Sequence, residues 1–72
     1  MIIKFKQDTE QEIIIDVIGD TVVTEMQIFE AGDEVKVDIC DYAEPPLARE
    51  LQFGDGSMAF VTPEFWAIVE IL

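Results

Sequence analysis

Short β-branched segments separated by turn residues follow one another along the whole chain, and this pattern most strongly limits its fold. In residues 34–39, a Val or Ile at every second position alternates with a charged residue, which is typical of a strand with one buried face. Residues 2–6 alternate in the same way, whereas residues 7–11 are polar and predict a loop. Because 72 residues leave room for only one small core, we expect a single all-β domain over residues 1–72.

The first predicted hairpin joins residues 12–18 to residues 21–29 through Gly19-Asp20. Glycine at the first of two turn residues predicts a type II′ turn, because that position requires a positive φ. The resulting register pairs Ile18 with Thr21, Val17 with Val22, Ile15 with Thr24 and Ile13 with Met26. One face of this hairpin is then almost entirely apolar, and we expect that face to point inward.

A second hairpin is predicted for residues 47–53 and 57–61, because Asp55-Gly56 is typical of a type I′ turn. Its register places Phe53 opposite Met58 and Leu51 opposite Phe60, and these four side chains are expected in the core. Pro45-Pro46 precedes this hairpin and cannot donate hydrogen bonds to a sheet.

The C-terminal segment begins with a helix signal. Thr62 is suited to the N-cap position and Pro63 to the first helical position. We expect about one turn, through Phe65-Trp66, followed by a closing strand over residues 67–71. The alternative is one amphipathic helix from Pro63 to Leu72, although its β-branched residues disfavour a helix.

Two stretches connect this order of elements with a known family. Residues 28–37 contain Gly32-Asp33 followed by alternating Val residues, and residues 60–66 run from a strand through Pro63 to Trp66. Both stretches resemble parts of SH3-type small β-barrels. The resemblance implies an all-β, single SH3-like barrel of five to six antiparallel strands, with a short 3₁₀ turn before the last strand.

The resemblance does not extend to the proline-rich peptide site of that family. Its groove is lined by aromatic residues, but this chain has none between Phe5 and Phe29. Leu47 or Ala48 stands where the family has a tryptophan, and Trp66 stands where it has a tyrosine. A single ring does not form the groove that polyproline II recognition needs, so we do not expect this activity.

Charge narrows the classes of partner. The chain has 16 acidic and 4 basic residues, for a net charge of −12. Such a charge repels nucleic acid and anionic membranes, so we expect neither as a direct partner. A protein with a basic surface is the expected partner. The lone Cys40 and the lack of a secretory signal pattern lead us to expect a cytoplasmic setting.

The residue types needed for catalysis and for tight metal binding are scarce. The chain has no histidine to activate Ser57 or Cys40 as a nucleophile. One cysteine without histidine does not supply the ligands of a zinc or iron–sulfur site, and the acidic residues do not follow the calcium-loop pattern. We therefore expect no enzyme activity, no catalytic residue, no cofactor and no metal.

Acidic side chains supply the candidate contact surface. Asp8, Glu10 and Glu12 occupy alternate positions, so on a strand they would project from one face about 6.5–7 Å apart. We expect Asp16 and Glu25 to continue along the same outer surface. The expected partner-contact face comprises Asp8, Glu10, Glu12, Asp16, Glu25 and Trp66. The leading hypothesis is a non-enzymatic acidic protein-interaction module. One alternative is a DNA-mimic inhibitor of a nucleic-acid-binding protein, such as a phage would encode, and a second alternative is a structural subunit of a viral particle.

Overall fold

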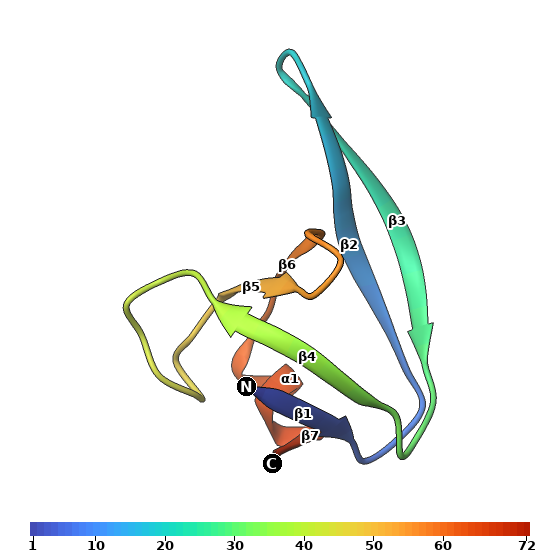
Figure 1. Ribbon diagram of the computed structural model, residues 1–72, viewed down its shortest axis with the longest axis vertical. Helices are drawn as coiled ribbons and strands as arrows, with labels where there is room; N and C mark the ends of the chain where they lie inside the picture. The colour runs from blue at the N-terminus through green and yellow to red at the C-terminus, as the bar shows by residue number, and fades with distance from the viewer.

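Seven antiparallel strands make up one sheet in the computed structural model, which describes residues 1–72 (Figure 1). The strands are β1 (Ile2–Phe5), β2 (Thr9–Ile18), β3 (Thr21–Phe29), β4 (Glu34–Ile39), β5 (Glu50–Phe53), β6 (Met58–Phe60) and β7 (Val69–Ile71). Their order across the sheet is β3-β2-β6-β5-β4-β1-β7. One short helix, α1 (Pro63–Ala67), connects β6 to β7.

The two ends of the chain fold largely as the sequence predicts. β1 and β4 are confirmed and pair with each other, with Ile3 opposite Val35. Thr62 occupies the N-cap position of α1 and Pro63 its first turn. The chain then turns back as β7, in which Ile71 lies opposite Ile3. The strand expected there is therefore confirmed, and the alternative of one helix to Leu72 is wrong.

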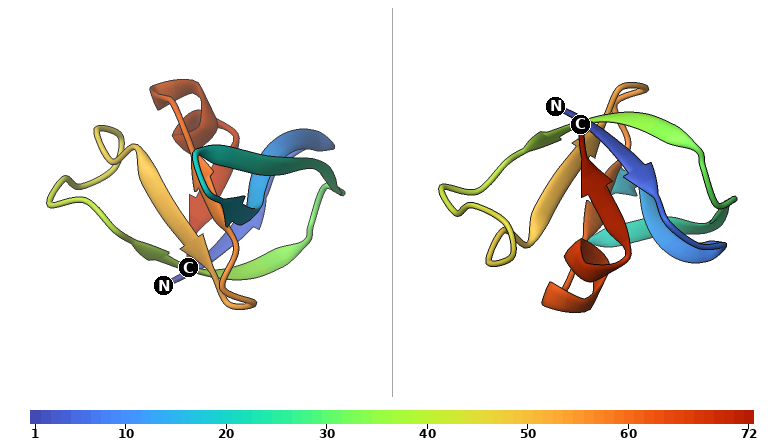
Figure 2. Two further views of the ribbon diagram at one scale, coloured as in Figure 1. Left: turned by 90° about the horizontal axis from the view of Figure 1, so that it is seen from above. Right: turned by 90° about the horizontal axis from the view of Figure 1, so that it is seen from below.

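The sheet is curved, with α1 at one end of it (Figure 2), and its buried side chains form a single core. Aromatic rings form its centre: Phe29 stacks between Phe5, at a centroid distance of 4.4 Å, and Phe53, at 5.9 Å. The Trp66 indole N–H donates to the Ala48 carbonyl oxygen over 2.8 Å, which satisfies a buried polar group. The thirteen buried residues form one cluster: Ile3, Phe5, Ile13, Phe29, Val37, Ala48, Leu51, Phe53, Ala59, Val61, Phe65, Trp66 and Val69.

The sheet is open and has seven strands, so the expectation of a closed SH3-like barrel of five to six strands is wrong. The turn before the last strand is the α-helix α1 and not the expected 3₁₀ turn. β3 and β7 are the two edges of the sheet and do not pair with each other. The connection between β2 and its inner neighbour β6 is minimal, because β6 has only three residues and a single register pair, Ile14 with Met58, joins the two strands. The distal part of the β2–β3 hairpin therefore extends beyond the body of the molecule (Figure 1).

A bulge changes the faces of this hairpin from those predicted. Gly19 has a φ of +61° while Asp20 has no positive φ, as a type II′ turn requires, and the predicted pairs next to the turn are present. The register then shifts between Ile14 and Asp16, so Ile15 is an extra residue. Beyond the bulge, Glu12 rather than Ile13 lies opposite Met26. The predicted register is wrong there, because a one-residue shift exchanges the two faces of a strand.

The register of the second hairpin also differs from the predicted one by a single residue. Only Gly56 has a positive φ, at +91°, whereas a type I′ turn needs two such residues. The Gly56 N–H and the Phe53 N–H donate to the carbonyls of Phe53 and Ser57, which encloses a loop of three residues. Leu51 consequently pairs with Ala59 instead of Phe60. Ala59 is buried and Phe60 is exposed, so the expectation of Phe60 in the core is wrong.

Candidate functional site

The β2–β3 hairpin, Thr9–Phe29, is the most unusual surface of the molecule, and we refer to it as the arm. Its register places Ile13, Gln27 and Phe29 on an inner face directed at the core. The opposite, outer face carries apolar residues that have no neighbour to cover them. Four of these, which we call the apolar stripe, are 52–67% exposed: Val17, Val22, Met26 and Ile28. Ile15 at the bulge and Ile18 next to the turn are exposed as well.

The stripe runs along an edge strand, because three of its four residues belong to β3. An edge strand presents unpaired backbone N–H and C=O groups. Few features of β3 would prevent it from pairing with another chain: it has no proline and no lysine, and its only charged residue is Glu25. A nine-residue edge of this kind is suited to contact with another protein chain.

The charge on the arm has one sign. It contains five acidic residues and no Lys or Arg: Glu10, Glu12, Asp16, Asp20 and Glu25. Glu10 and Glu12 lie on the outer face, opposite Ile28 and Met26 of the stripe. The arm therefore combines an uncovered apolar surface with a negative border.

The sequence-predicted contact residues do not form one surface. Glu10 and Glu12 share the outer face, whereas the bulge places Asp16 with Val23 and Glu25 with Ile13 on the inner side. The Asp8 carboxylate accepts the Ala31 N–H at 2.9 Å, so it fixes the loop between β3 and β4. Trp66 is only 8% exposed and belongs to the core. The structure thus divides the four predicted acidic residues of the arm between its two faces, with Glu10 and Glu12 on the outer face and Asp16 and Glu25 on the inner face.

Sequence reasoning missed the stripe because it assigned those residues to the core. A signal was present in Ile13-Ile14-Ile15, where three consecutive apolar residues occupy both faces of one strand. A chain that buries only 13 of its 72 residues does not cover both faces of a long hairpin.

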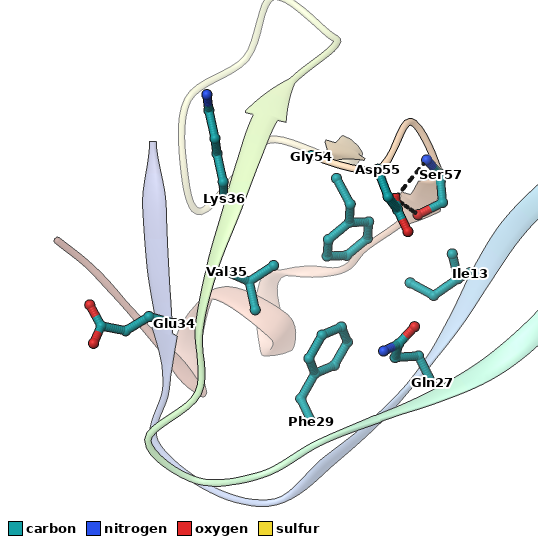
Figure 3. A pocket seen from close by; sticks show the side chains of 10 residues that line it. Ile13, Gln27, Phe29, Glu34, Val35, Lys36, Gly54, Asp55 and Ser57 are labelled. Carbon is teal, nitrogen blue, oxygen red and sulfur yellow. Dashed lines mark hydrogen bonds between the residues drawn. The ribbon is translucent and has the colours of Figure 1, made fainter.

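A cavity of about 310 Å³ opens at the base of the arm, between its inner face, β4 and the β5–β6 loop (Figure 3). Its apolar lining consists of Ile13, Phe29, Val35 and Phe53. Gln27 and Asp55 contribute polar groups at its mouth. Glu34 and Lys36 also border the cavity, but their side chains extend away from its interior (Figure 3).

Asp55 is the charged group that the fold places most firmly at this cavity. Its Oδ1 accepts the Ser57 hydroxyl at 2.6 Å and the Ser57 backbone N–H at 3.0 Å. These bonds, the hydroxyl first, hold the pKa of Asp55 below its ordinary value because they stabilise the charged form. Both bonds end on Oδ1, which leaves Oδ2 free for another donor.

The remaining chemistry of the molecule is sparse. No three carboxylate or thiolate groups converge in the arrangement that a metal ion needs. Cys40 is exposed and unpaired, and its thiol lies 3.9 Å from the Asp38 carbonyl oxygen. Neither its length nor its composition lets α1 cross a lipid bilayer.

Comparison of the chain with protein-family models, curated proteins and solved structures finds no match. The SH3-type resemblance of residues 28–37 and 60–66 is therefore without support from related proteins, and the open sheet contradicts the closed barrel that it implied.

Proposed function

We propose that this chain is a non-enzymatic protein-interaction module whose arm binds a partner with an apolar surface bordered by Lys and Arg side chains. The observation that carries the proposal is the apolar stripe, which is more than half exposed along an edge strand. Contiguous exposed apolar surface on a small domain is typical of interaction sites. The negative border specifies the charge of the partner.

The size of the stripe supports a contact that also needs polar interactions. Full burial of a Val, Met or Ile side chain stabilises by about 1.5–3 kcal/mol, and each stripe residue has roughly half of its surface left to bury. Covering four such residues contributes about 3–6 kcal/mol in total. Association costs at least about 4 kcal/mol in lost freedom, so the stripe alone gives weak binding. Ion pairs at its border add specificity and speed of association.

Charge favours a basic partner over a second copy of this chain. A copy would bring another net charge of −12, with five more acidic residues on its own arm. Like charges across an interface are destabilising. A partner with Lys and Arg beside an apolar cleft gains from the same charges that oppose self-association.

The register gives the DNA-mimic alternative little support. A mimic needs carboxylates in a continuous row that follows a phosphate backbone. On the arm such a row comprises Glu10 and Glu12, and the bulge directs Asp16 and Glu25 to the other face. The outer face continues instead with the apolar residues of the stripe.

Affinity purification from the cells that express the chain tests the proposal. The stripe variant combines Val22→Thr and Met26→Thr, which place β-branched threonine at both positions of β3 and reduce its apolar surface. The control variant combines Leu47→Thr and Ile71→Thr, because these exposed apolar residues lie outside the arm. The wild-type chain and the control variant are expected to retain one specific partner, which the stripe variant loses.

Two further outcomes separate this function from the alternatives. Retention is expected to fall as the salt concentration is raised, because the ion pairs at the border are screened, and to require the stripe at low salt as well. A partner that binds the stripe variant as strongly as wild type, and is lost completely at high salt, would favour the acidic decoy. Assembly of the purified chain alone into large particles would favour the structural subunit. Either result would overturn the proposal.

A further inference from the structure

The cavity at the base of the arm has no role in the stripe contact, because it opens on the opposite face. At about 310 Å³ it lies at the lower limit of small-molecule sites, which span about 300–1,000 Å³. It therefore suits one large side chain better than a cofactor. Its lining is apolar in depth and carries polar groups at the mouth.

We propose that this cavity receives one long basic side chain, a lysine or arginine, from the protein partner. The methylene stem would pack against Ile13, Phe29 and Val35, and the cationic head would reach the free Oδ2 of Asp55. Lys and Arg commonly bury their stems along apolar surface while their charged ends remain near water. The inference rests on the proposed function in that the side chain is assigned to the same basic partner.

Three features of the cavity select a cation. The Ser57 hydrogen bonds fix the orientation of the Asp55 carboxylate, so little side-chain freedom is lost on binding. The Lys36 ammonium, the one cation bordering the cavity, is directed away from it (Figure 3). Gln27 adds an amide oxygen at the mouth that can accept a second hydrogen bond. An anionic group would meet Asp55 without any opposing positive charge inside the cavity.

The aromatic residues give the site its shape. Phe29 is held between Phe5 and Phe53 by ring stacking, so its ring position is fixed by the core. Both faces of the Phe29 ring are therefore occupied, and a further aromatic ring has no free face of Phe29 on which to stack. An aliphatic stem needs no such face, which favours Lys or Arg over an aromatic side chain.

An NMR titration of the ¹⁵N-labelled full chain tests the inference. The probes are N-acetyl-arginine amide and N-acetyl-lysine amide, and N-acetyl-leucine amide is the uncharged control. At constant ionic strength, the two cationic probes are expected to shift the amides of Ile13, Phe29, Val35 and Ser57 with saturation. The leucine probe is expected to shift them much less.

Matched variants distinguish direct contact of the probes with Asp55 from their general attraction to the negative charge of the protein. Asp55→Asn keeps the acceptor for Ser57 and removes the charge, so binding of both cationic probes should weaken about two- to fivefold. Glu34→Gln removes an equal charge from a side chain that borders the cavity but points away from it, and Asp20→Asn removes one at the tip of the arm. Both should bind like wild type. The spectrum of each variant shows whether it is folded.

The results also distinguish this inference from the proposed function. The stripe variant should bind the probes normally, because its substitutions lie on the other face of the arm. Shifts that do not saturate, shifts spread over the whole acidic surface, or equal binding by Asp55→Asn and wild type would overturn the cavity assignment. None of these results would affect partner retention by the stripe.

Discussion

The stability of the stripe variant distinguishes an uncovered arm from one packed in a closed barrel. Val22 and Met26 are 52% and 55% exposed, so Val22→Thr with Met26→Thr loses only partial burial. Thr has good β propensity, and its hydroxyl remains in water. We expect the free energy of unfolding to fall by about 1 kcal/mol or less. In a closed barrel each buried hydroxyl without a partner would cost about 1–3 kcal/mol in addition to the lost packing.

Two core variants calibrate this measurement. Ile3 and Leu51 are fully buried, so Ile3→Val should cost about 0.5–1.5 kcal/mol and Leu51→Ala about 2–5 kcal/mol. A domain of 72 residues has about 4–11 kcal/mol of stability in total, from 0.05–0.15 kcal/mol per residue. Ile3→Val should therefore remain folded even where Leu51→Ala does not.

Urea denaturation followed by Trp66 fluorescence provides the assay, because Trp66 is buried against Ala48. The stripe variant should shift the midpoint no more than Ile3→Val, with an unchanged slope. A loss of about 3 kcal/mol or more in the stripe variant would mean that the stripe is part of the core and that the arm is not an uncovered surface.

Three other predictions concern the β5–β6 loop and the core. Gly56→Ala should destabilise the protein by about 1–2 kcal/mol, because Gly56 has a φ of +91°. Gly54→Ala should be nearly neutral, because a Cβ there meets only ordinary contacts at 3.8 Å or more. Equal losses of stability in thermal unfolding of the two variants would contradict this. Ser57→Ala should raise the pKa of Asp55 toward its ordinary value in a ¹³C carboxyl titration, since it removes the strongest hydrogen bond to the charged form. Because its pKa is lowered, ionised Asp55 stabilises the fold above its ordinary pKa of 3.8, and this contribution is lost as the pH falls through the folded-state value. Wild type should therefore lose more stability below pH 3.8 than Ser57→Ala. Identical loss of stability in acid for the two proteins would contradict this role of Ser57. Trp66→Phe should cost about 1–3 kcal/mol, because the Ala48 carbonyl loses its buried donor, and a neutral result in urea denaturation would show that water replaces the indole.

The sequence was sufficient to predict most elements and their kinds. Alternation placed β4 at the residues observed, Glu34–Ile39, and Thr62-Pro63 located the start of α1. Both of these signals are local, because they depend on side-chain period and on cap geometry. Their success therefore did not depend on the rest of the fold.

The registers could not be predicted, for a physical reason common to both hairpins. Each hairpin holds one residue more than predicted: Ile15 as a bulge in β2, and a third residue in the Gly54–Gly56 loop. Such an insertion leaves composition and turn residues unchanged but exchanges the faces of a strand. Met26 and Phe60 are exposed rather than buried for this reason.

The candidate site could be predicted from the sequence only to the same extent. The sequence identified the acidic character of the arm, and Glu10 and Glu12 do share a face. The stripe and the cavity depend on which side of the ladder each residue occupies and on the gap beside β4, so residue types alone did not predict them.

Solvent exposure of the arm is the most direct test of this account. A neutral paramagnetic gadolinium chelate broadens the NMR signals of methyl groups that it can approach. In the free protein, the methyl signals of Val17, Val22, Met26 and Ile28 should broaden strongly, and those of Ile3, Val37 and Leu51 should persist. If the stripe methyls were protected as well as those three core residues, the arm would be packed against the body and the proposed binding surface would not exist.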